Sequence, residues 1–216
     1  MSVLVFANGD MPETEWLQPY FEKATAVIAA DGGVYHVLAC GRYPDVVVGD
    51  MDSITAETRT ELQAHHVKLM VHPAEKDETD LELALLYAAE HYTEREILIF
   101  GVLGGRLDQT LANILLLAHP DLRQKRVRLV EKYQRAWIVY DRTNIYGAEG
   151  DTVSLVPLGG DVHIDQTTNL KWPLHNEVLS FGPARGVSNV LTAAHATVTL
   201  KQGQLLCIHS QKEWQR

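Results

Sequence analysis

Short apolar runs, rich in β-branched and aromatic residues, alternate with helical patterns over residues 1–131. Runs of this length and composition are typical of buried parallel strands. We predict strands at residues 3–7, 26–30, 46–48, 67–71 and 97–100. Because strands that alternate with helices usually form a mostly parallel sheet covered on both faces, this half of the chain is predicted to be an α/β domain.

The clearest helical patterns span residues 80–91 and 108–119. Around the second, apolar residues follow the spacing of one helix face, and Pro120 stops the pattern. These apolar residues are Leu107, Leu111, Ile114, Leu115 and Ala118. A further helix is expected to begin near Thr55.

After about Val130 the helical patterns end, and short strand-like runs are separated by glycine, asparagine and proline turns. The runs lie at residues 137–140, 152–156, 178–181, 196–200 and 205–209. We therefore predict an N-terminal, mostly parallel α/β sheet domain at 1–131, followed by a C-terminal antiparallel β-sandwich domain at 132–216. Four histidines of this half are interpreted as surface residues of the sandwich: His163, His175, His195 and His209.

Composition places the chain among ordinary globular proteins and excludes a disordered one. Of the 216 residues, 46% are hydrophobic and 22% are charged, and the formal net charge is −9. A nucleic-acid groove would need a basic stripe. The densest basic run, residues 123–128, is too short for one and is interpreted as a solvated connection. No nucleic-acid partner is expected.

Cysteine use and hydropathy indicate a cytoplasmic protein without a membrane partner. Cys40 and Cys207 are far apart and have no metal-type spacing, so neither a disulfide framework nor a zinc site is expected. No apolar run approaches the roughly 18 residues of a membrane helix. The opening residues 1–7 are interpreted as a first strand and not as a signal peptide.

The polar residues that follow the predicted strands carry the candidate chemistry, because ligands of open parallel sheets bind beyond the carboxyl ends of the strands. Asp50 and Asp52 come directly after the apolar run 46–48. Two carboxylates at this spacing can converge on one cation, and Mg²⁺ prefers oxygen ligands. The same two residues also fit a turn before the helix near Thr55, so both interpretations stay open.

A charged segment, Lys-Asp-Glu-Thr-Asp at 76–80, opens the first predicted helix. Thr79 and Glu82 have the spacing of a capping box, which leaves the other charged residues unexplained. Helix N-termini stabilise anions, so Lys76 can add a positive charge on a bound phosphate. Asp80 lies in the first turn, where it can face the same metal as the Asp-x-Asp pair.

A glycine-rich stretch, residues 101–109, leads into the second predicted helix. Backbone amides of such a loop can approach phosphate oxygens closely, and Arg106 is placed for bidentate phosphate contact. Asp108 is also explained as the N-cap of the helix. The glycine patterns of the P-loop and of dinucleotide-binding folds are absent.

Taken together and in this order, the motifs resemble those of the thiamine pyrophosphokinase family. The resemblance runs through Asp31-Gly32-Gly33, Pro44-Asp45, Gly49-Asp50-Met51-Asp52-Ser53, Lys76-Asp77-Glu78-Thr79-Asp80, Gly104-Gly105-Arg106-Leu107-Asp108-Gln109 and Asn113. Leu170-Lys171-Trp172-Pro173-Leu174 and Gly186-Val187-Ser188-Asn189 are similar to that family's second-domain signatures. Gln109 stands where many members carry histidine.

The resemblance implies that the protein transfers the pyrophosphoryl group of ATP to the hydroxyl of thiamine, giving thiamine diphosphate and AMP. It implies a homodimer with active sites between subunits, ATP and Mg²⁺ bound by the first domain, and thiamine bound with the second.

The residues that match the family's motifs have implied functions. The implied metal ligands are Asp50, Asp52 and Asp80, and the implied catalytic residues are these three with Arg106 and Asp108, the latter a candidate general base. The implied ATP-binding residues are Asp31, Gly32, Gly33, Lys76, Asp77, Thr79, Gly104, Gly105 and Arg106. The implied thiamine-binding residues are Asp108, Gln109, Asn113, Trp172, Ser188 and Asn189.

The residues by themselves leave other functions open. One is a pyrophosphokinase for another small hydroxymethyl compound, such as a pterin. Another is a haloacid-dehalogenase-like phosphatase, in which Asp50 would attack phosphorus but the Gly-Gly-Arg-x-Asp motif would have no function. A third is a module that binds ATP·Mg²⁺ as a sensor without catalysis. Trp172 also fits the core or an interface of the sandwich.

Overall fold

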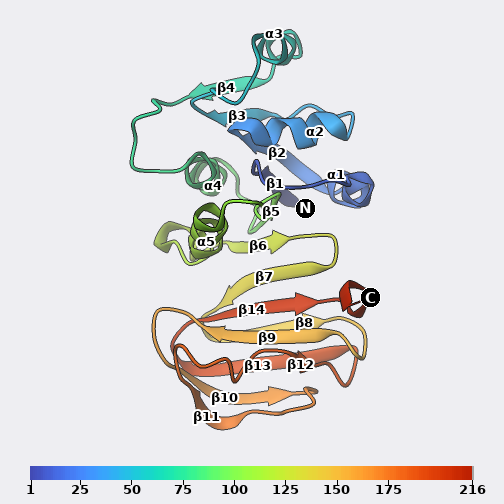
Figure 1. Cartoon of the computed structure of the whole chain (residues 1–216), viewed down its shortest axis with the longest axis vertical. Helices are drawn as coiled ribbons and strands as arrows, with labels where there is room; N and C mark the ends of the chain where they lie inside the picture. Colours follow the sequence, from blue (N-terminus) through green and yellow to red (C-terminus); the bar gives the residue numbers. More distant parts are fainter. Residues whose placement is uncertain (216) are drawn as a thin grey trace. The chain divides into compact units, whose positions relative to one another are not determined.

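The protein, described here by a computed structural model for residues 1–215, divides into two compact units. The first is Met1–Leu129 and the second begins at Val130. Figure 1 shows helices and strands in the first unit and an almost entirely β structure in the second. The predicted fold class, an α/β sheet followed by an antiparallel sandwich, is confirmed.

The first unit is built on a parallel sheet with the strand order β4-β3-β2-β1-β5-β6. Its strands are β1 (Ser2–Phe6), β2 (Ala24–Ala30), β3 (Val46–Gly49), β4 (Lys68–Val71), β5 (Glu96–Phe100) and β6 (Arg126–Val130). Every residue of β1 is buried, as a parallel strand covered on both faces requires. Each strand predicted in this half is present.

Short and long helices accompany this sheet. They are α1 (Gln18–Phe21), α2 (Val34–Ala39), α3 (Ala56–Ala64), α4 (Asp80–His91) and α5 (Leu107–Leu116), with 3-10 turns η1 (Glu15–Leu17), η2 (Asp31–Gly33) and η3 (Pro120–Leu122). The helix predicted at 80–91 has these bounds in the structure. The helix predicted at 108–119 ends earlier, because the chain turns into η3 at Pro120.

The apolar face of α5 is exposed and not buried. Leu107, Leu111 and Leu115 recur at every fourth position and are 80%, 55% and 46% exposed. The buried residue of this helix is the polar Asn113. The periodicity therefore identifies the helix correctly, but the leucine stripe does not pack on the sheet of its own unit.

Strand β6 corrects the interpretation of the basic run 123–128 as a solvated connection. Arg126 begins a strand that pairs in parallel with β5. Val127 and Leu129 are buried while Arg126 is exposed. This alternation is the period-two pattern of a half-buried strand. The pattern was not recognised in the sequence because its outward positions are arginines within a basic run.

The second unit contains two antiparallel sheets, with strand orders β12-β9-β14-β7 and β11-β10-β13-β8. The strands are β7 (Gln134–Val139), β8 (Arg142–Tyr146), β9 (Thr152–Pro157), β10 (Val162–Thr168), β11 (His175–Leu179), β12 (Asn189–Val190), β13 (His195–Gln202) and β14 (Leu205–Ser210). Buried residues from both sheets, among them Leu155, Cys207, Ile164 and Val198, form one apolar core. Such a core between two sheets defines the β-sandwich.

The sequence predicts the sandwich strands unevenly. Runs at 137–140, 152–156, 196–200 and 205–209 fall largely in β7, β9, β13 and β14. The run 178–181 is displaced, because β11 ends at Leu179 and the amide of Phe181 donates to the Asp161 carboxylate. Strands β8 and β10 were not predicted, since their polar outward residues dilute the apolar signal, and β12 was not predicted because it has only two residues.

A buried hydrogen bond between two side chains ties the end of β14 to the turn before β9. His209 Nε2 lies 2.8 Å from Asp151 Oδ2, and the two side chains are 5% and 3% exposed. His209 is therefore not a surface residue, which corrects the sequence-based interpretation. Asp151 also accepts hydrogen bonds from the amides of Ala148 (2.9 Å) and Lys212 (3.1 Å). Burial raises the pKa of Asp151, but the hydrogen bonds and His209 outweigh it and lower the pKa overall.

The first prediction concerns this pair. Replacing Asp151 by Asn is expected to reduce the free energy of unfolding at neutral pH by about 3 kcal/mol, because an amide N–H would face a buried donor. Urea titration measures the change. The matched variant Asp165→Asn removes a half-exposed carboxylate 3.6 Å from Lys201 Nζ. It is expected to change the free energy of unfolding by less than about 0.5 kcal/mol.

The same pair predicts a pH dependence. Because the folded state lowers the pKa of Asp151, the folded chain binds fewer protons than the unfolded chain. The stabilisation is therefore complete above the unfolded pKa of about 4 and is lost as pH falls through the folded pKa. The difference between wild type and Asp151→Asn should shrink in acid. A difference that stays constant down to about pH 2 would contradict the assignment.

Candidate active site

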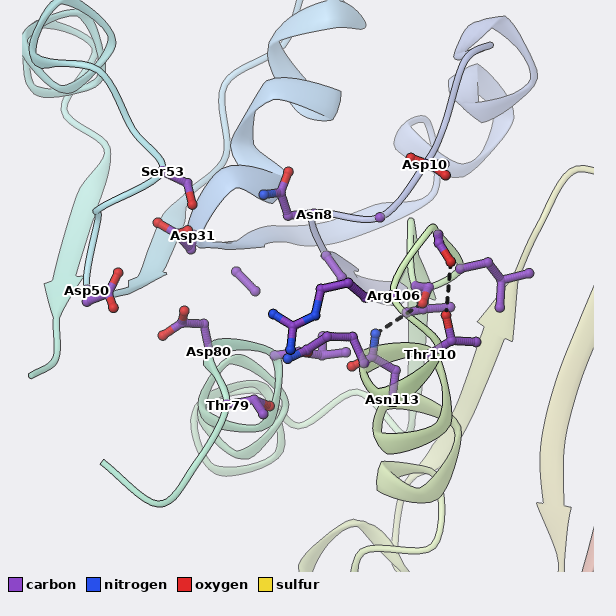
Figure 2. A pocket seen from close by; sticks show the side chains of 18 of the residues that line it. Asn8, Asp10, Asp31, Asp50, Ser53, Thr79, Asp80, Arg106, Thr110 and Asn113 are labelled. Atoms are coloured by element: carbon purple, nitrogen blue, oxygen red, sulfur yellow. Dashed lines mark hydrogen bonds between the residues drawn. The ribbon is translucent and has the colours of Figure 1, made fainter. Parts of the chain in front are cut away.

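A pocket of about 780 Å³ opens at the carboxyl edge of the parallel sheet. It is lined by the loops that follow strands β1 to β5, by the first turn of α4 and by the first two turns of α5, all in the first unit (Figure 2). The strand order changes direction at β1, with β2 on one side of it and β5 on the other. Loops diverge at such a point and leave a crevice, which is where open parallel sheets bind ligands.

The loops after β1 and β5 run together above this crevice. The amide of Gly9 donates to Gly101 O at 2.7 Å, and the amide of Asp10 donates to Leu103 O at 2.7 Å. A Cβ at Gly9 would lie 2.3 Å from Leu103 O, so this approach requires glycine. His36 of α2 adds a hydrogen bond of 2.8 Å between its Nε2 and Gly9 O. Together these contacts fix the backbone of one wall.

The Gly32-Gly33 turn allows a second close approach between loops. A Cβ at Gly33 would lie 2.1 Å from the backbone oxygen of Phe6, and one at Gly32 would lie 2.4 Å from Asn8 Nδ2. Neither glycine lines the pocket itself. The two glycines therefore bring β1 and η2 together, and the polar residues on either side, Asn8 and Asp31, reach the pocket.

Asp31, which lines the pocket, has a strained backbone conformation and a buried carboxylate. Its φ is +42°, a conformation that non-glycine residues adopt at some energetic cost. The residue is 7% exposed, and its Oδ1 atom accepts no hydrogen bond from any residue in the described range 1–215. A buried carboxylate oxygen without a donor is destabilising, and a bound cation would relieve it.

The Asp50–Asp52 loop brings two further carboxylates to the same place. Met51, between them, has a φ of +67° and is 4% exposed in the apolar cluster under the loop. Burial of Met51 leaves Asp50 and Asp52 facing the pocket, and the amide of Asp52 donates to Asp50 Oδ1 at 3.0 Å. Ligand oxygens of Asp31, Asp50 and Asp52 all lie within 4.8 Å of one another, close enough to share one cation.

Asp80 faces this cluster from the first turn of α4, as Figure 2 shows. The Thr79 half of the predicted capping box is present, since Thr79 Oγ1 accepts from the amide of Glu82 at 3.1 Å. Lys76 Nζ lies 3.0 Å from Asp80 Oδ1. Burial is the largest influence on the Asp80 carboxyl, and with the nearby charges of Asp50 and Asp31 it raises the pKa despite Lys76. A divalent cation would reverse that repulsion.

The glycine-rich loop and α5 form the opposite wall. Arg106 Nε donates to Asp108 Oδ1 at 3.2 Å, and this exposed pair lowers the pKa of Asp108. The N-cap position of α5 is Arg106, so Asp108 is not the cap. Asn113 Nδ2 donates to Val102 O at 3.0 Å, which joins α5 to the loop. Gln109 lines the pocket with an exposed side chain.

The structure brings most sequence-predicted site residues of the first unit to one pocket. Those that line it are Asp31, Asp50, Asp52, Lys76, Thr79, Asp80, Gly104, Gly105, Arg106, Gln109 and Asn113. Asp77, Asp108, Gly32 and Gly33 do not line it. Asn8, Asp10 and Thr110 line it but were not named as site residues. The signal for the first two was present, because Asn8 and Asp10 directly follow the first strand.

Comparison with known proteins identifies the family to which the chain belongs. Residues 17–130 match the family described as thiamin pyrophosphokinase, catalytic domain, and residues 139–205 match thiamin pyrophosphokinase, vitamin B1 binding domain. The thiamine pyrophosphokinase of Bacillus subtilis (strain 168) is 34% identical over 213 residues, which cover 97% of this chain and 98% of the relative. The chain belongs to the thiamine pyrophosphokinase family. It is accordingly an enzyme of the kind that makes thiamine diphosphate.

Solved structures of the thiamine pyrophosphokinase family share the fold. The crystal structure of the Bacillus subtilis protein has a TM-score of 0.87 at 31% identity, covering 98% of this chain and 99% of that one. The Geobacillus thermodenitrificans structure has a TM-score of 0.83 at 28% identity, with 98% of each chain covered. Yeast thiamin pyrophosphokinase, 16% identical with a TM-score of 0.79 over 97% of this chain and 86% of that one, shares the fold alone.

The part that matches the vitamin B1 binding domain of thiamine pyrophosphokinases carries the remaining predicted residues. Trp172 is 54% exposed, so it is not part of the sandwich core. Ser188 has a φ of +62°, and its amide donates to Ser154 Oγ at 3.1 Å. Asn189 is 6% exposed and hydrogen-bonds the backbone of Trp172. These three residues therefore belong to one locality of the second unit.

Proposed function

We propose that the protein binds ATP with Mg²⁺ in the pocket of the first unit and transfers its pyrophosphoryl group to the hydroxyl of thiamine, releasing AMP. The observation that supports this most directly is the composition of the pocket. Ligand oxygens of Asp31, Asp50 and Asp52 lie within 4.8 Å of one another, and Gly104, Gly105 and Arg106 line the same pocket. A cation site beside a phosphate-type loop suits a metal-bound polyphosphate.

The acidic residues fit Mg²⁺ as its ligands. Oxygen donors are the ligands that this ion prefers, and it usually keeps waters and phosphate oxygens in its shell. The buried Oδ1 of Asp31 lacks a donor within residues 1–215, which supports adding Asp31 to the set predicted from sequence, Asp50, Asp52 and Asp80. When bound, the ion would polarise the phosphates and neutralise charge that develops on them.

The cationic side chains would bind the polyphosphate and stabilise developing charge. Arg106 lines the pocket from the glycine-rich loop, and Lys76 lines it from the segment before α4. The fork of an arginine matches phosphate oxygens, and lysine supplies a point charge. Positioning and charge stabilisation account for most catalysis of phosphoryl transfer, so these residues have functions that need no covalent step. The remaining ATP-binding residues proposed are Gly32, Gly33, Asp77, Thr79, Gly104 and Gly105.

The attacking hydroxyl of thiamine must lose a proton, and Asp108 is the proposed acceptor. In the structure Asp108 is paired with Arg106, which lowers the pKa of its carboxyl and makes it a weak base. Phosphate that draws Arg106 into the pocket would break this pair and make Asp108 more basic. Arg106 would therefore couple ATP binding to an increase in the basicity of Asp108, which accepts the proton of the thiamine hydroxyl.

Thiamine recognition is proposed for two groups of residues. Asp108, Gln109 and Asn113 belong to the first unit, while Trp172 and the Ser188–Asn189 segment belong to the second. The aminopyrimidine needs hydrogen-bond partners, and the exposed indole of Trp172 can stack on a ring.

A homodimer is proposed from the exposed stripe of α5. Leu107, Leu111 and Leu115 form an apolar row on the helix that also carries Gln109 and Asn113. Rows of exposed leucine are uncommon on monomers and mark interaction sites. A second copy of this chain, with its own stripe, is the proposed partner.

A cytoplasmic location is also proposed. Cys40 and Cys207 are thiols, as expected in a reducing compartment. Within the part of the chain that the structure describes, no helix combines the length and apolar character needed to cross a membrane.

The second prediction is the product of the reaction. Purified protein with ATP·Mg²⁺ is expected to form AMP only when thiamine is added, with an equal amount of thiamine diphosphate. Chromatography of nucleotides and thiamine esters measures both. A hydroxymethyl pterin offered as the acceptor should give no AMP. Release of inorganic phosphate without AMP, or tight ATP binding without turnover, would contradict the proposal.

The third prediction tests the metal ligands. Asp52→Ala is expected to lower turnover by at least about 100-fold, because one ligand is worth several kcal/mol of charge stabilisation. Asp52 is exposed, so the variant should unfold at the same denaturant concentration as wild type. Glu90→Ala, which removes an exposed carboxylate of α4 that does not line the pocket, is the matched control and should retain full turnover. Wild-type activity in Asp52→Ala would remove Asp52 from the site.

The fourth prediction tests the dimer surface. Leu111→Lys is expected to convert the dimer into a monomer, because it places a charge in the middle of the apolar stripe. Sedimentation velocity measures the molecular mass. Gln124→Lys adds the same charge at an exposed position outside the stripe and should leave the dimer intact. A Leu111→Lys protein that sediments as a dimer would place the interface elsewhere.

A further inference from the structure

The loop that carries Trp172 lies alongside the short strand β12 in the second unit. Leu170 and Leu191 form an antiparallel bridge, and the amide of Lys171 donates to Val190 O at 2.9 Å. The backbone pairing therefore follows the loop as far as Lys171. One residue later, the partner of the Trp172 backbone is a side chain.

The carboxamide of Asn189 holds the Trp172 backbone at both of its polar groups. Asn189 Oδ1 accepts from the Trp172 amide at 3.0 Å, and Asn189 Nδ2 donates to Trp172 O at 2.7 Å. The same Oδ1 also accepts from the amide of Val190 at 2.9 Å. An amide side chain that both accepts and donates reproduces one rung of a β ladder, so Asn189 continues the ladder by one residue.

The hydrogen bonds also limit what else Asn189 can do. A carboxamide has two acceptor and two donor positions, and the three contacts above use all but one donor. The residue is 6% exposed. Trp172 is the opposite case, since it is 54% exposed and its ring has Lys171 Nζ 4.8 Å from the centroid. The buried Asn189 is therefore suited to holding the backbone of Trp172, and the exposed indole of Trp172 is suited to contacting a ligand.

The segment 189–191 is paired to the sandwich by its backbone. Asn189 pairs with Val153 of β9, and the amide of Leu191 donates to the backbone oxygen of Asp151 at 2.9 Å. Asp151 is the residue whose side chain is held by His209. The segment 189–191 therefore connects the exposed loop of Trp172, through Asn189, to Asp151, through Leu191.

We propose that Asn189 is a positioning residue that sets the indole of Trp172 for the ring of thiamine and acts on thiamine binding through Trp172. This inference rests on the proposed function for its substrate. It differs from direct recognition of thiamine by Asn189, because it predicts that the effect of Asn189 disappears when the indole is absent.

The claim that Asn189 holds the backbone of Trp172 is tested without any substrate. In Asn189→Ala, amide hydrogen exchange at Trp172 is expected to accelerate by about tenfold or more, since its acceptor is gone. Exchange in the buried strand β13 should not change. Asn144→Ala, an exposed asparagine of β8 in the same unit, is the matched control and should leave exchange at Trp172 as in wild type. Unchanged exchange at Trp172 in Asn189→Ala would overturn the proposal.

The functional part uses a double-mutant cycle. Asn189→Ala alone is expected to raise the KM for thiamine by about fivefold to thirtyfold, the loss expected from one or two hydrogen bonds, and to leave the KM for ATP unchanged. Added to Trp172→Ala, it should raise the KM for thiamine by less than about twofold. Effects of the two substitutions that multiply in full would show that Asn189 contacts thiamine itself and would overturn the proposal.

The isosteric variant Asn189→Asp covers the case in which alanine prevents folding. It keeps the acceptor for the Trp172 amide and replaces the donor to Trp172 O by an oxygen, so it should raise the KM for thiamine in the same direction and show the same dependence on Trp172. If wild type makes no AMP with thiamine, the proposed function has failed. The exchange experiment then decides separately whether Asn189 holds Trp172.

Discussion

Repulsion between carboxylates at one sheet edge is the constraint around which the first unit is organised. The loops after β2 and β3 and the first turn of α4 all deliver an aspartate to the same end of the pocket. Burial and the neighbouring carboxylates raise the pKa of Asp80, so the arrangement is electrostatically unfavourable without a partner ion. Lys76 offsets part of it through its contact with Asp80. The site therefore has the charge balance of a receptor for a cation and for the polyphosphate that a cation accompanies.

Holding those aspartates together depends on backbone contacts that only small residues allow. Gly33 permits η2 to touch the end of β1, and Gly9 permits the β1 loop to touch the β5 loop. Asp31 and Met51, which have positive φ values, are both buried, and their packing maintains these conformations. The rigid frame is therefore made of backbone, which leaves the polar side chains free to bind ligands.

Much of this site was predictable because parallel strands end at one edge. Asp31, Asp50 and the 101–109 loop each follow an apolar run, so their common location follows once the parallel sheet is inferred. The sequence did not show which aspartates come close enough to share one cation. Asp31 joins Asp50 and Asp52 because of its φ of +42° and its burial, and neither is visible in a pattern of residue types. Asn8 and Asp10 follow the first strand and line the pocket, but they were not assigned a function, because a strand end predicts location and not which way a side chain points.

The errors have a common physical origin in context that the local sequence does not contain. The sequence suggests that His209 is a surface residue, yet it is buried and hydrogen-bonded to Asp151, a partner that is distant in sequence. The leucines of α5 follow the spacing of one helix face, and the sequence did not say that this face would be exposed. The thiamine-binding prediction for Asn189 stays a prediction, but the hydrogen bonds from its side chain to the backbone of Trp172 were likewise not visible in the sequence. In each case the residue type indicates that a polar or apolar partner is needed, and the tertiary structure decides which partner it is.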